Sequence, residues 1–239
     1  MKAMVLAAGE GRRLRPMTDA VPKPMVSVAG EPVLGRALGR LADAGVRDVV
    51  INLHHRADAI QSYCGDGSRW GIRIAYSPEP TLQGTAGALR RWRAFFDETF
   101  LVIYGDNIWT CDLNRFVAFH RASSALATVA LFRREDAGQS GVADVAGDGR
   151  ITRFVEKPGD AGAFSGWVNA GLLALEPAAL QWIPEAGAPD FGRDLLPSWL
   201  AAGQPVFGYR MTGDENLWWI DTPDDLGRAE RELAAEVTR

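Results

Sequence analysis

The sequence predicts an α/β fold in which helices cover a largely parallel sheet. Short apolar runs of strand length alternate with stretches of helical periodicity through the first hundred residues. This alternation is typical of parallel strands joined by helices. Two of the apolar runs end in turns whose residues could bind a ligand: a glycine turn after Ala8 and an acidic turn after Tyr104. Ligands of open α/β sheets bind at the carboxyl ends of the strands, so both turns are expected at a ligand site.

The periodicity and the turn residues predict each element in chain order. In the first half, strands are expected at 3–8, 48–53, 72–76 and 100–104, and helices at 31–44, 55–64 and 84–96. In the second half, strands are expected at 126–132, 142–145, 151–155, 168–175 and 206–211, and helices at 112–123, 190–202 and 222–237. Asp112 and Thr222 are predicted N-caps, Gly45 ends the first long helix, and Pro197 interrupts the helix over 190–202.

Composition excludes several classes of protein. The chain has 239 residues with a net charge of −4, so a nucleic acid is not an expected partner. No apolar run approaches the roughly 18 residues that a membrane span requires, so no membrane partner is expected. Cys64 and Cys111 have no metal-type spacing and predict no disulfide framework. With no signal peptide after Met1, a cytoplasmic location is expected.

The glycine turn after the first strand has the composition of a polyphosphate site. Gly9 and Gly11 allow the backbone to turn tightly, and amides in such a turn can bind an anion. Cations follow closely, at positions 12, 13, 15 and 23. The string is neither a P-loop nor a dinucleotide-binding loop, because Leu14 stands where the latter needs its third glycine. The alternative is an ordinary turn beside a solvated basic patch, which the clustering of cations disfavours.

Four further segments each allow a functional and a purely structural interpretation. Gly84 and Gly87 permit close approach of a planar ligand, with Thr85 as a helix cap, or they simply aid packing. Asp106, at a strand end, could hold a hard cation or be a turn residue. Glu156 and Lys157 form either a site or a solvated hairpin, and Asn169 either binds a ligand or marks a bulge. Asp221 could simply favour the helix N-terminus that follows it.

These segments together resemble a known family. The string L-A-A-G-x-G-x-R-L-R-P-M-T from Leu6 to Thr18, followed by P-K-P-M, is similar to the signature of sugar-1-phosphate nucleotidyltransferases. That family includes mannose-1-phosphate guanylyltransferases and glucose-1-phosphate thymidylyltransferases. Later segments G-T-A-G-A-L, G-D, E-K-P and W-x-D match in the same order. Departures are Ser27 in place of a proline, an inserted Gln83, and the absence of the usual Gly-Thr after Asp221.

The resemblance implies a Rossmann-like three-layer sandwich with a mixed, mostly parallel central sheet, the nucleotide-diphospho-sugar transferase fold. It implies one domain over 1–239, with a nucleotide-binding half at 1–110 and a sugar-phosphate-binding half at 111–239. No C-terminal β-helix domain is expected, because the chain ends soon after Asp221. The implied reaction is magnesium-dependent transfer of a nucleotidyl group from a nucleoside triphosphate to a sugar 1-phosphate.

The resemblance also assigns roles to residues. Arg13 and Lys23 are the implied catalytic residues, which neutralise the phosphates, and Asp106 and Asp221 are the implied Mg²⁺ ligands. Nucleotide binding is implied for Leu6, Ala8, Gly9, Gly11, Glu79, Gly84, Thr85 and Gly105. Sugar-phosphate binding is implied for Gly141, Glu156, Lys157 and Asn169.

Within the family, the segment from Leu82 to Leu89 favours guanylyl transfer to mannose 1-phosphate. Thymidylyl, uridylyl or cytidylyl transfer to glucose 1-phosphate or another hexose 1-phosphate is the alternative. A non-catalytic regulatory subunit would be expected to lack the arginine, the lysine or an aspartate, and all are present here. The expected partners are the triphosphate and the sugar 1-phosphate. The sequence permits a homodimer but contains no feature that predicts one.

Overall fold

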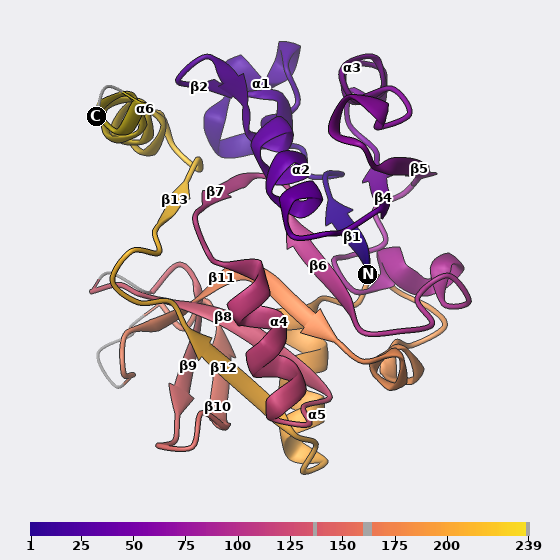
Figure 1. Cartoon of the computed structure of the whole chain (residues 1–239), viewed down its shortest axis with the longest axis vertical. Helices are drawn as coiled ribbons and strands as arrows, with labels where there is room; N and C mark the ends of the chain where they lie inside the picture. Colours follow the sequence, from indigo (N-terminus) through magenta and orange to yellow (C-terminus); the bar gives the residue numbers. More distant parts are fainter. Residues whose placement is uncertain (136–137, 160–163, 238–239) are drawn as a thin grey trace. The chain divides into compact units, whose positions relative to one another are not determined.

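The computed structural model describes residues 1–135, 138–159 and 164–237, and it divides the chain into two compact units (Figure 1). The glycine-loop unit comprises Ala3–Leu82, Ile103–Trp109 and the chain from Leu217 onward. The Glu-Lys-Pro unit comprises Met1–Lys2, Gln83–Val102 and Thr110–Asn216. Each unit is therefore assembled from segments that are far apart in the sequence.

The glycine-loop unit contains strands in the order β6-β1-β4-β5. The strands are β1 (Lys2–Leu6), β4 (Asp48–Leu53), β5 (Arg73–Pro78) and β6 (Phe100–Tyr104), which enters from the other unit. β4 and β5 pair in parallel along their whole length. Helices α1 (Met17–Ala20), α2 (Val33–Asp43) and α3 (Ala57–Cys64) belong to this unit, and α2 buries an apolar face that includes Leu34, Leu38 and Leu41.

Two short strand pairs and the C-terminal helix pack together beside the segment after the glycine loop. The strand pairs are the hairpin of β2 (Ser27–Val28) with β3 (Glu31–Pro32) and the antiparallel pair of β7 (Asn107–Trp109) with β13 (Leu217–Trp219). Helix α6 (Pro223–Val237) packs on them through a core of Leu14, Val26, Val28, Val33, Ile108, Trp218, Ile220, Ala229 and Leu233. Glu230 of α6 also accepts a hydrogen bond from Ala29 N at 2.8 Å. The C-terminal helix thus supports the segment that follows Lys23.

The Glu-Lys-Pro unit is built on strands in the order β10-β9-β11-β8-β12. Its elements are α4 (Leu113–Ala122), β8 (Ala127–Arg133), β9 (Gly141–Val145), β10 (Ile151–Glu156), β11 (Trp167–Leu175), α5 (Leu196–Ala201) and β12 (Val206–Arg210). β12 pairs with β8 in parallel, and the other pairs are antiparallel. Parallel and antiparallel pairs therefore both occur in the chain, which confirms the predicted mixed α/β fold.

Most predicted elements are confirmed, two of them to the residue: the strands at Asp48–Leu53 and Phe100–Tyr104. Asp112 caps α4 by accepting from Asn114 N and Arg115 N, and Thr222 and Asp225 form a reciprocal cap on α6. The pairing of β7 with β13 was not predicted, because strands of three residues show no periodicity.

Two predicted helices differ from the structure. The helix expected at 84–96 is only a 3₁₀ helix over Gly87–Trp92, and the left-handed φ of 76° at Gly84 excludes that residue from a helix. The helix expected at 190–202 begins with a π-helical turn over Phe191–Leu195 before α5. Pro197 has no N–H to donate to the preceding turn, and Leu195 N bonds Asp190 O at 3.1 Å instead.

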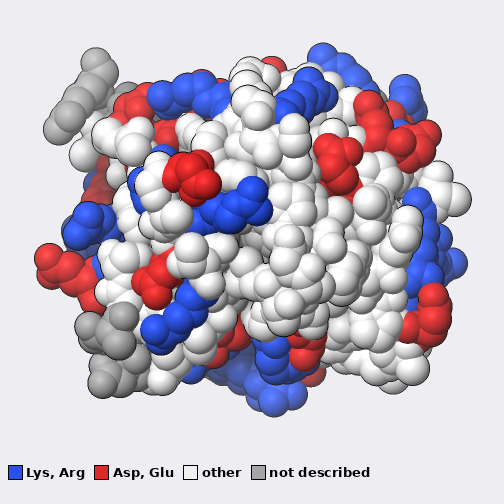
Figure 2. Space-filling model, turned by 90° about the horizontal axis from the view of Figure 1, so that it is seen from below, with Lys and Arg blue, Asp and Glu red and all other residues white. Residues whose placement is uncertain are grey.

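On the face drawn in Figure 2, basic and acidic side chains are interspersed around a largely uncharged centre. Within the described part of the chain, no helix combines the length and the apolar character needed to cross a membrane.

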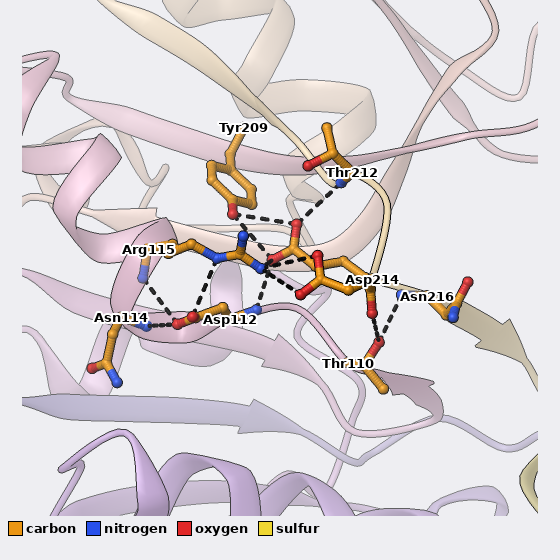
Figure 3. Close-up of polar contacts among 9 residues, drawn as sticks. Thr110, Asp112, Asn114, Arg115, Tyr209, Thr212, Asp214 and Asn216 are labelled. Atoms are coloured by element: carbon orange, nitrogen blue, oxygen red, sulfur yellow. Dashed lines mark hydrogen bonds and ion pairs between the residues drawn. The ribbon is translucent and has the colours of Figure 1, made fainter. Parts of the chain in front are cut away.

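A polar cluster around Glu215 ties the loop after β12 to the start of α4 (Figure 3). Glu215 is 3% exposed, and its carboxylate accepts hydrogen bonds from Asp112 N at 2.8 Å, Tyr209 Oη at 3.0 Å and Thr212 N at 3.1 Å. The guanidinium of Arg115 lies 3.4 Å from the same carboxylate. Removal of the carboxylate would break these three partly buried hydrogen bonds at once.

We therefore predict that Glu215→Ala lowers the free energy of unfolding by about 3 kcal/mol, since three hydrogen bonds are lost and each contributes about 1 kcal/mol. Asp214→Ala is the matched control, because Asp214 also pairs with Arg115 but its side chain is 77% exposed. Urea denaturation of both variants measures the difference. Equal effects of the two substitutions would show that the buried carboxylate does not organise this loop.

Candidate functional site

The glycine loop follows β1 and is packed closely against the segment that carries Lys23. Ala7 N donates to the side chain of Asn52 at 2.7 Å, which fixes the end of the strand. Gly11 has φ +62°, and a Cβ added there would lie 2.9 Å from Cβ of Lys23 and from Cγ2 of Thr18. Thr18 Oγ1 also donates to Gly11 O at 2.8 Å. Gly11 is therefore required both for its conformation and for this close approach.

Lys23 is a buried cation held between two carboxylates. It begins a 3₁₀ turn over Lys23–Met25, between Pro22 and Pro24, and is 7% exposed. Its Nζ lies 2.6 Å from Asp106 Oδ2 and 2.6 Å from Asp221 Oδ1. Burial alone would lower the pKa of Lys23, but the two carboxylates together outweigh burial and raise that pKa above its usual value. Lys23 is therefore charged at neutral pH.

The two aspartates come from segments that are far apart in the sequence. Asp106 lies in the turn from β6 to β7, and Gly105 N in that turn donates to Leu6 O at 2.9 Å. Asp221 follows β13, whose Trp219 pairs with Asn107 of β7. Both aspartates follow apolar strand segments, and the carboxyl ends of parallel strands would be one way to bring such residues together. The antiparallel β7–β13 pair does so instead.

Arg13 completes a cluster of four charges, since its guanidinium lies 2.9 Å from Asp221 Oδ2. The cations Arg13 and Lys23 balance the two aspartates. Because both carboxylates face one cationic nitrogen, their oxygens suit a hard cation such as Mg²⁺, which takes one or two carboxylates plus phosphates and waters. Over residues 1–135, 138–159 and 164–237, no group of three or more His, Cys, Asp or Glu side chains could hold a metal by itself. The remaining ligands would have to come from a substrate or from water.

Glu79 lies at the end of β5 and is oriented by an amide that the sequence analysis did not single out. Asn52 Nδ2 donates to Glu79 Oε1 at 2.9 Å, while Asn52 Oδ1 accepts from Ala7 N. Both side chains are buried. Asn52 thus links the glycine loop to Glu79. Its signal in the sequence was a single amide among the apolar residues at 49–53.

In the Glu-Lys-Pro unit, Thr85 is bound to Asp190. Thr85 Oγ1 donates to Asp190 Oδ2 at 2.7 Å and accepts from Phe191 N at 2.9 Å. The expectation that Thr85 caps a helix was therefore wrong, because the 3₁₀ helix begins after Ala86 without a side-chain cap. Asp190 was not singled out from the sequence, and its carboxylate also accepts from Gly192 N and Arg193 N.

Glu156 lies in a niche lined by two glycines of the same unit. A Cβ added to Gly141 or to Gly192 would press on the Glu156 carboxylate. The pKa of Glu156 is raised, mainly because burial disfavours its charged form and secondly because the negative charge of Asp190 lies nearby. Lys157 beside it is exposed, with φ +48°, and its backbone N donates to Ser140 O at 3.1 Å.

Asn169 lies where the β11–β8 ladder becomes irregular, between Asn169 and Leu173. Its Oδ1 accepts from Gly171 N at 2.9 Å, so the structural alternative, a bulge, is present. A role for Asn169 in sugar binding stays a prediction. The other residues named from the sequence lie on the elements just described: Leu6, Ala8 and Gly9 at the glycine loop, and Gly84 before the 3₁₀ helix.

Comparisons with known proteins identify the family to which this chain is similar. The family model described as nucleotidyl transferase matches residues 2–236. A UTP–glucose-1-phosphate uridylyltransferase from Synechocystis is 36% identical over 92% of this chain and 60% of its own length. A mannose-1-phosphate guanylyltransferase from Mycobacterium tuberculosis is 32% identical over 98% of this chain and 65% of its own length. The chain thus spans less than two thirds of the length of these curated relatives.

Solved structures show the same fold. A Bacillus anthracis crystal structure assigned as a glucose-1-phosphate thymidylyltransferase matches with a TM-score of 0.86 at 24% identity. The match covers 97% of this chain and 94% of that one. At this level of identity the likeness supports the α/β fold alone.

The niche around Glu156 predicts a pH-dependent effect on stability. A raised pKa means that folded Glu156 binds a proton more tightly than it does in the unfolded chain. The free energy of unfolding should therefore fall as the pH rises from the usual carboxyl value of 4.5 through the raised value. Glu156→Gln should raise the thermal midpoint near neutral pH by about 2 to 4 °C, and this gain should shrink near the usual carboxyl pKa.

Differential scanning calorimetry at several pH values measures this effect. Glu135→Gln, on the exposed side chain of Glu135, is the control and should show no pH-dependent gain. A Glu156→Gln midpoint that follows the wild type at every pH would contradict the raised pKa.

Proposed function

The chain belongs to the nucleotidyl transferase family, and we propose that it transfers a nucleotidyl group from a nucleoside triphosphate to a sugar 1-phosphate. The observation that supports this most is the position of Lys23, which lies behind a glycine loop and between two aspartates. Loop amides, two cations and a pair of carboxylates are what binding of a triphosphate with a divalent cation requires.

In the proposed reaction, a phosphate oxygen of the sugar 1-phosphate attacks the α-phosphorus of the triphosphate. The bond from the α-phosphorus to the oxygen bridging to the β-phosphate breaks, and pyrophosphate leaves. The nucleophile is already an anion, so no covalent protein intermediate is needed. The work of the protein is therefore positioning and charge neutralisation.

On the nucleotide side, we assign triphosphate binding to the amides of the glycine loop and to Arg13 and Lys23. Arg13 is exposed and Lys23 is buried, so they suit outer and inner phosphate groups respectively. Asp106 and Asp221 would hold Mg²⁺, which would neutralise phosphate charge when bound.

On the sugar side, we assign the sugar phosphate to Lys157 and a sugar hydroxyl to Glu156. The partial burial of Glu156 supports this role, since a desolvated carboxylate forms stronger hydrogen bonds than a solvated one. Gly141 would keep room beside that carboxylate, and Asn169 would offer its amide to another hydroxyl. Gly84 and Thr85 are assigned to the nucleotide base.

For the nucleotide, we propose GTP with mannose 1-phosphate, and the orientation of Glu79 supports this. Guanine presents two adjacent donors, N1–H and N2–H, which match the two oxygens of a carboxylate. Uracil and thymine present one N–H between two carbonyl oxygens, which a carboxylate would repel. Asn52 holds Glu79 through one oxygen. Uridylyl, thymidylyl or cytidylyl transfer to another hexose 1-phosphate is the alternative, and the relatives' names include guanylyl and uridylyl transfer.

Pyrophosphate release with each common nucleoside triphosphate against several sugar 1-phosphates tests the proposal. We expect the highest kcat/KM with GTP and mannose 1-phosphate. Preference for a pyrimidine nucleotide would leave the reaction class standing and contradict the role of Glu79. No release with any pair, by a protein that still binds nucleotide, would contradict the reaction class and favour a non-catalytic nucleotide-sugar-binding subunit.

The carboxylate pair predicts a metal requirement. EDTA should abolish turnover, and added Mg²⁺ should restore it. Asp106→Asn and Asp221→Asn should each lower kcat by about 10²-fold or more, the scale of losing one preorganised electrostatic contact. Steady-state kinetics across Mg²⁺ concentrations measures both. If Asp221→Asn keeps near-normal activity while Asp106→Asn does not, the second ligand is a different residue, and Asp224 and Asp225 are the next to test.

A further inference from the structure

Lys23 is one of only three lysines in a chain with 26 lysine and arginine residues. The other two are Lys2 and Lys157. An ordinary basic position in this protein is therefore an arginine. A lysine differs from an arginine in carrying a compact point charge rather than a planar fork. A compact cation between two carboxylates occupies the point where a metal ion bound to both would lie, and its charge has the same sign.

We infer that Lys23 is an internal competitor for the divalent cation: its ammonium group holds Asp106 and Asp221 until a nucleotide arrives, so that the metal binds with the nucleotide and not before it. The inference rests on the proposed function in taking a divalent cation and a nucleoside triphosphate as the ligands.

The geometry leaves no room for both cations at once. Nζ of Lys23 is 2.6 Å from an oxygen of each aspartate, so a metal ion that binds both of these oxygens would meet the ammonium group at the same point. The backbone of Lys23 is held by the hydrogen bonds Met25 N to Pro22 O at 2.7 Å and Val26 N to Lys23 O at 3.1 Å. The Lys23 side chain must therefore withdraw before a metal ion can bind these two oxygens, and it needs a new acceptor to do so.

The charges give the same result. Arg13 and Lys23 cancel Asp106 and Asp221, so the cluster as a whole has no net attraction for a cation. A divalent ion that entered alone would add two positive charges beside a buried ammonium group, which is costly at low effective dielectric. A triphosphate supplies the missing negative charge and offers Nζ an acceptor on the side of the glycine loop. Metal and nucleotide affinities are therefore coupled through one side chain.

Titration of Mn²⁺ into the free protein, followed by calorimetry without nucleotide, tests the inference. Lys23→Met removes the charge and keeps the length of the side chain, and it should bind Mn²⁺ at least about tenfold more tightly than the wild type. Lys23→Arg keeps the charge and should stay weak. Lys2→Met is the matched control and should change nothing, since Lys2 also lies 2.6 Å from an aspartate but pairs with only one, the exposed Asp97. A Lys23→Met protein that binds Mn²⁺ no better than the wild type would overturn the inference.

A second measurement needs no variant. In wild-type protein labelled with ¹⁵N-lysine, the side-chain spectrum contains signals from only three residues. Mg²⁺ alone should leave the Lys23 signal in place, and Mg²⁺ with GTP or with UTP should shift it. A shift with Mg²⁺ alone, or none with either nucleotide, would contradict the competition. Neither measurement depends on turnover, so an absence of pyrophosphate release would count against the proposed function and not against the role of Lys23.

Discussion

The buried ammonium group of Lys23 needs both Asp106 and Asp221, because an unpaired charge in that position would be too costly to desolvate. This requirement links parts of the chain that have no other reason to meet. The turn after β6 supplies one carboxylate, and the residue after β13 supplies the other. The β7–β13 pair and helix α6 then hold these segments in place. The residues from β13 to α6 therefore help to hold the charged cluster beside the glycine loop.

The acidic groups have opposite electrostatic environments in the two units. In the glycine-loop unit, the aspartates are neutralised by cations at hydrogen-bonding distance. In the Glu-Lys-Pro unit, Glu156 is partly desolvated near Asp190, and its raised pKa means that its ionised form lowers stability. Such a cost is expected where a group serves binding rather than folding. In both units a glycine, Gly11 or Gly141, leaves room for the charged side chain.

The sequence predicted the local features well, because they depend on neighbours in the chain. The apolar run 100–104 and the caps at Asp112 and Thr222 are such features. The hydrogen-bond partners of side chains could not be predicted from the sequence. Asn52 binds Glu79 and Thr85 binds Asp190, at separations of 27 and 105 residues. The resemblance implied that Lys23, Asp106 and Asp221 belong to one site. It did not show that the lysine lies between the aspartates, since no local pattern encodes a contact across 198 residues.

A pair of crystal structures would test the central claim most directly, one of the free protein and one with Mg²⁺ and a nucleoside triphosphate. The account predicts that Nζ of Lys23 contacts both aspartates in the free protein. In the complex, the metal should lie between Asp106 and Asp221, and Nζ should contact a phosphate oxygen. A complex in which Lys23 still bridges the two aspartates while the metal binds elsewhere would contradict the account.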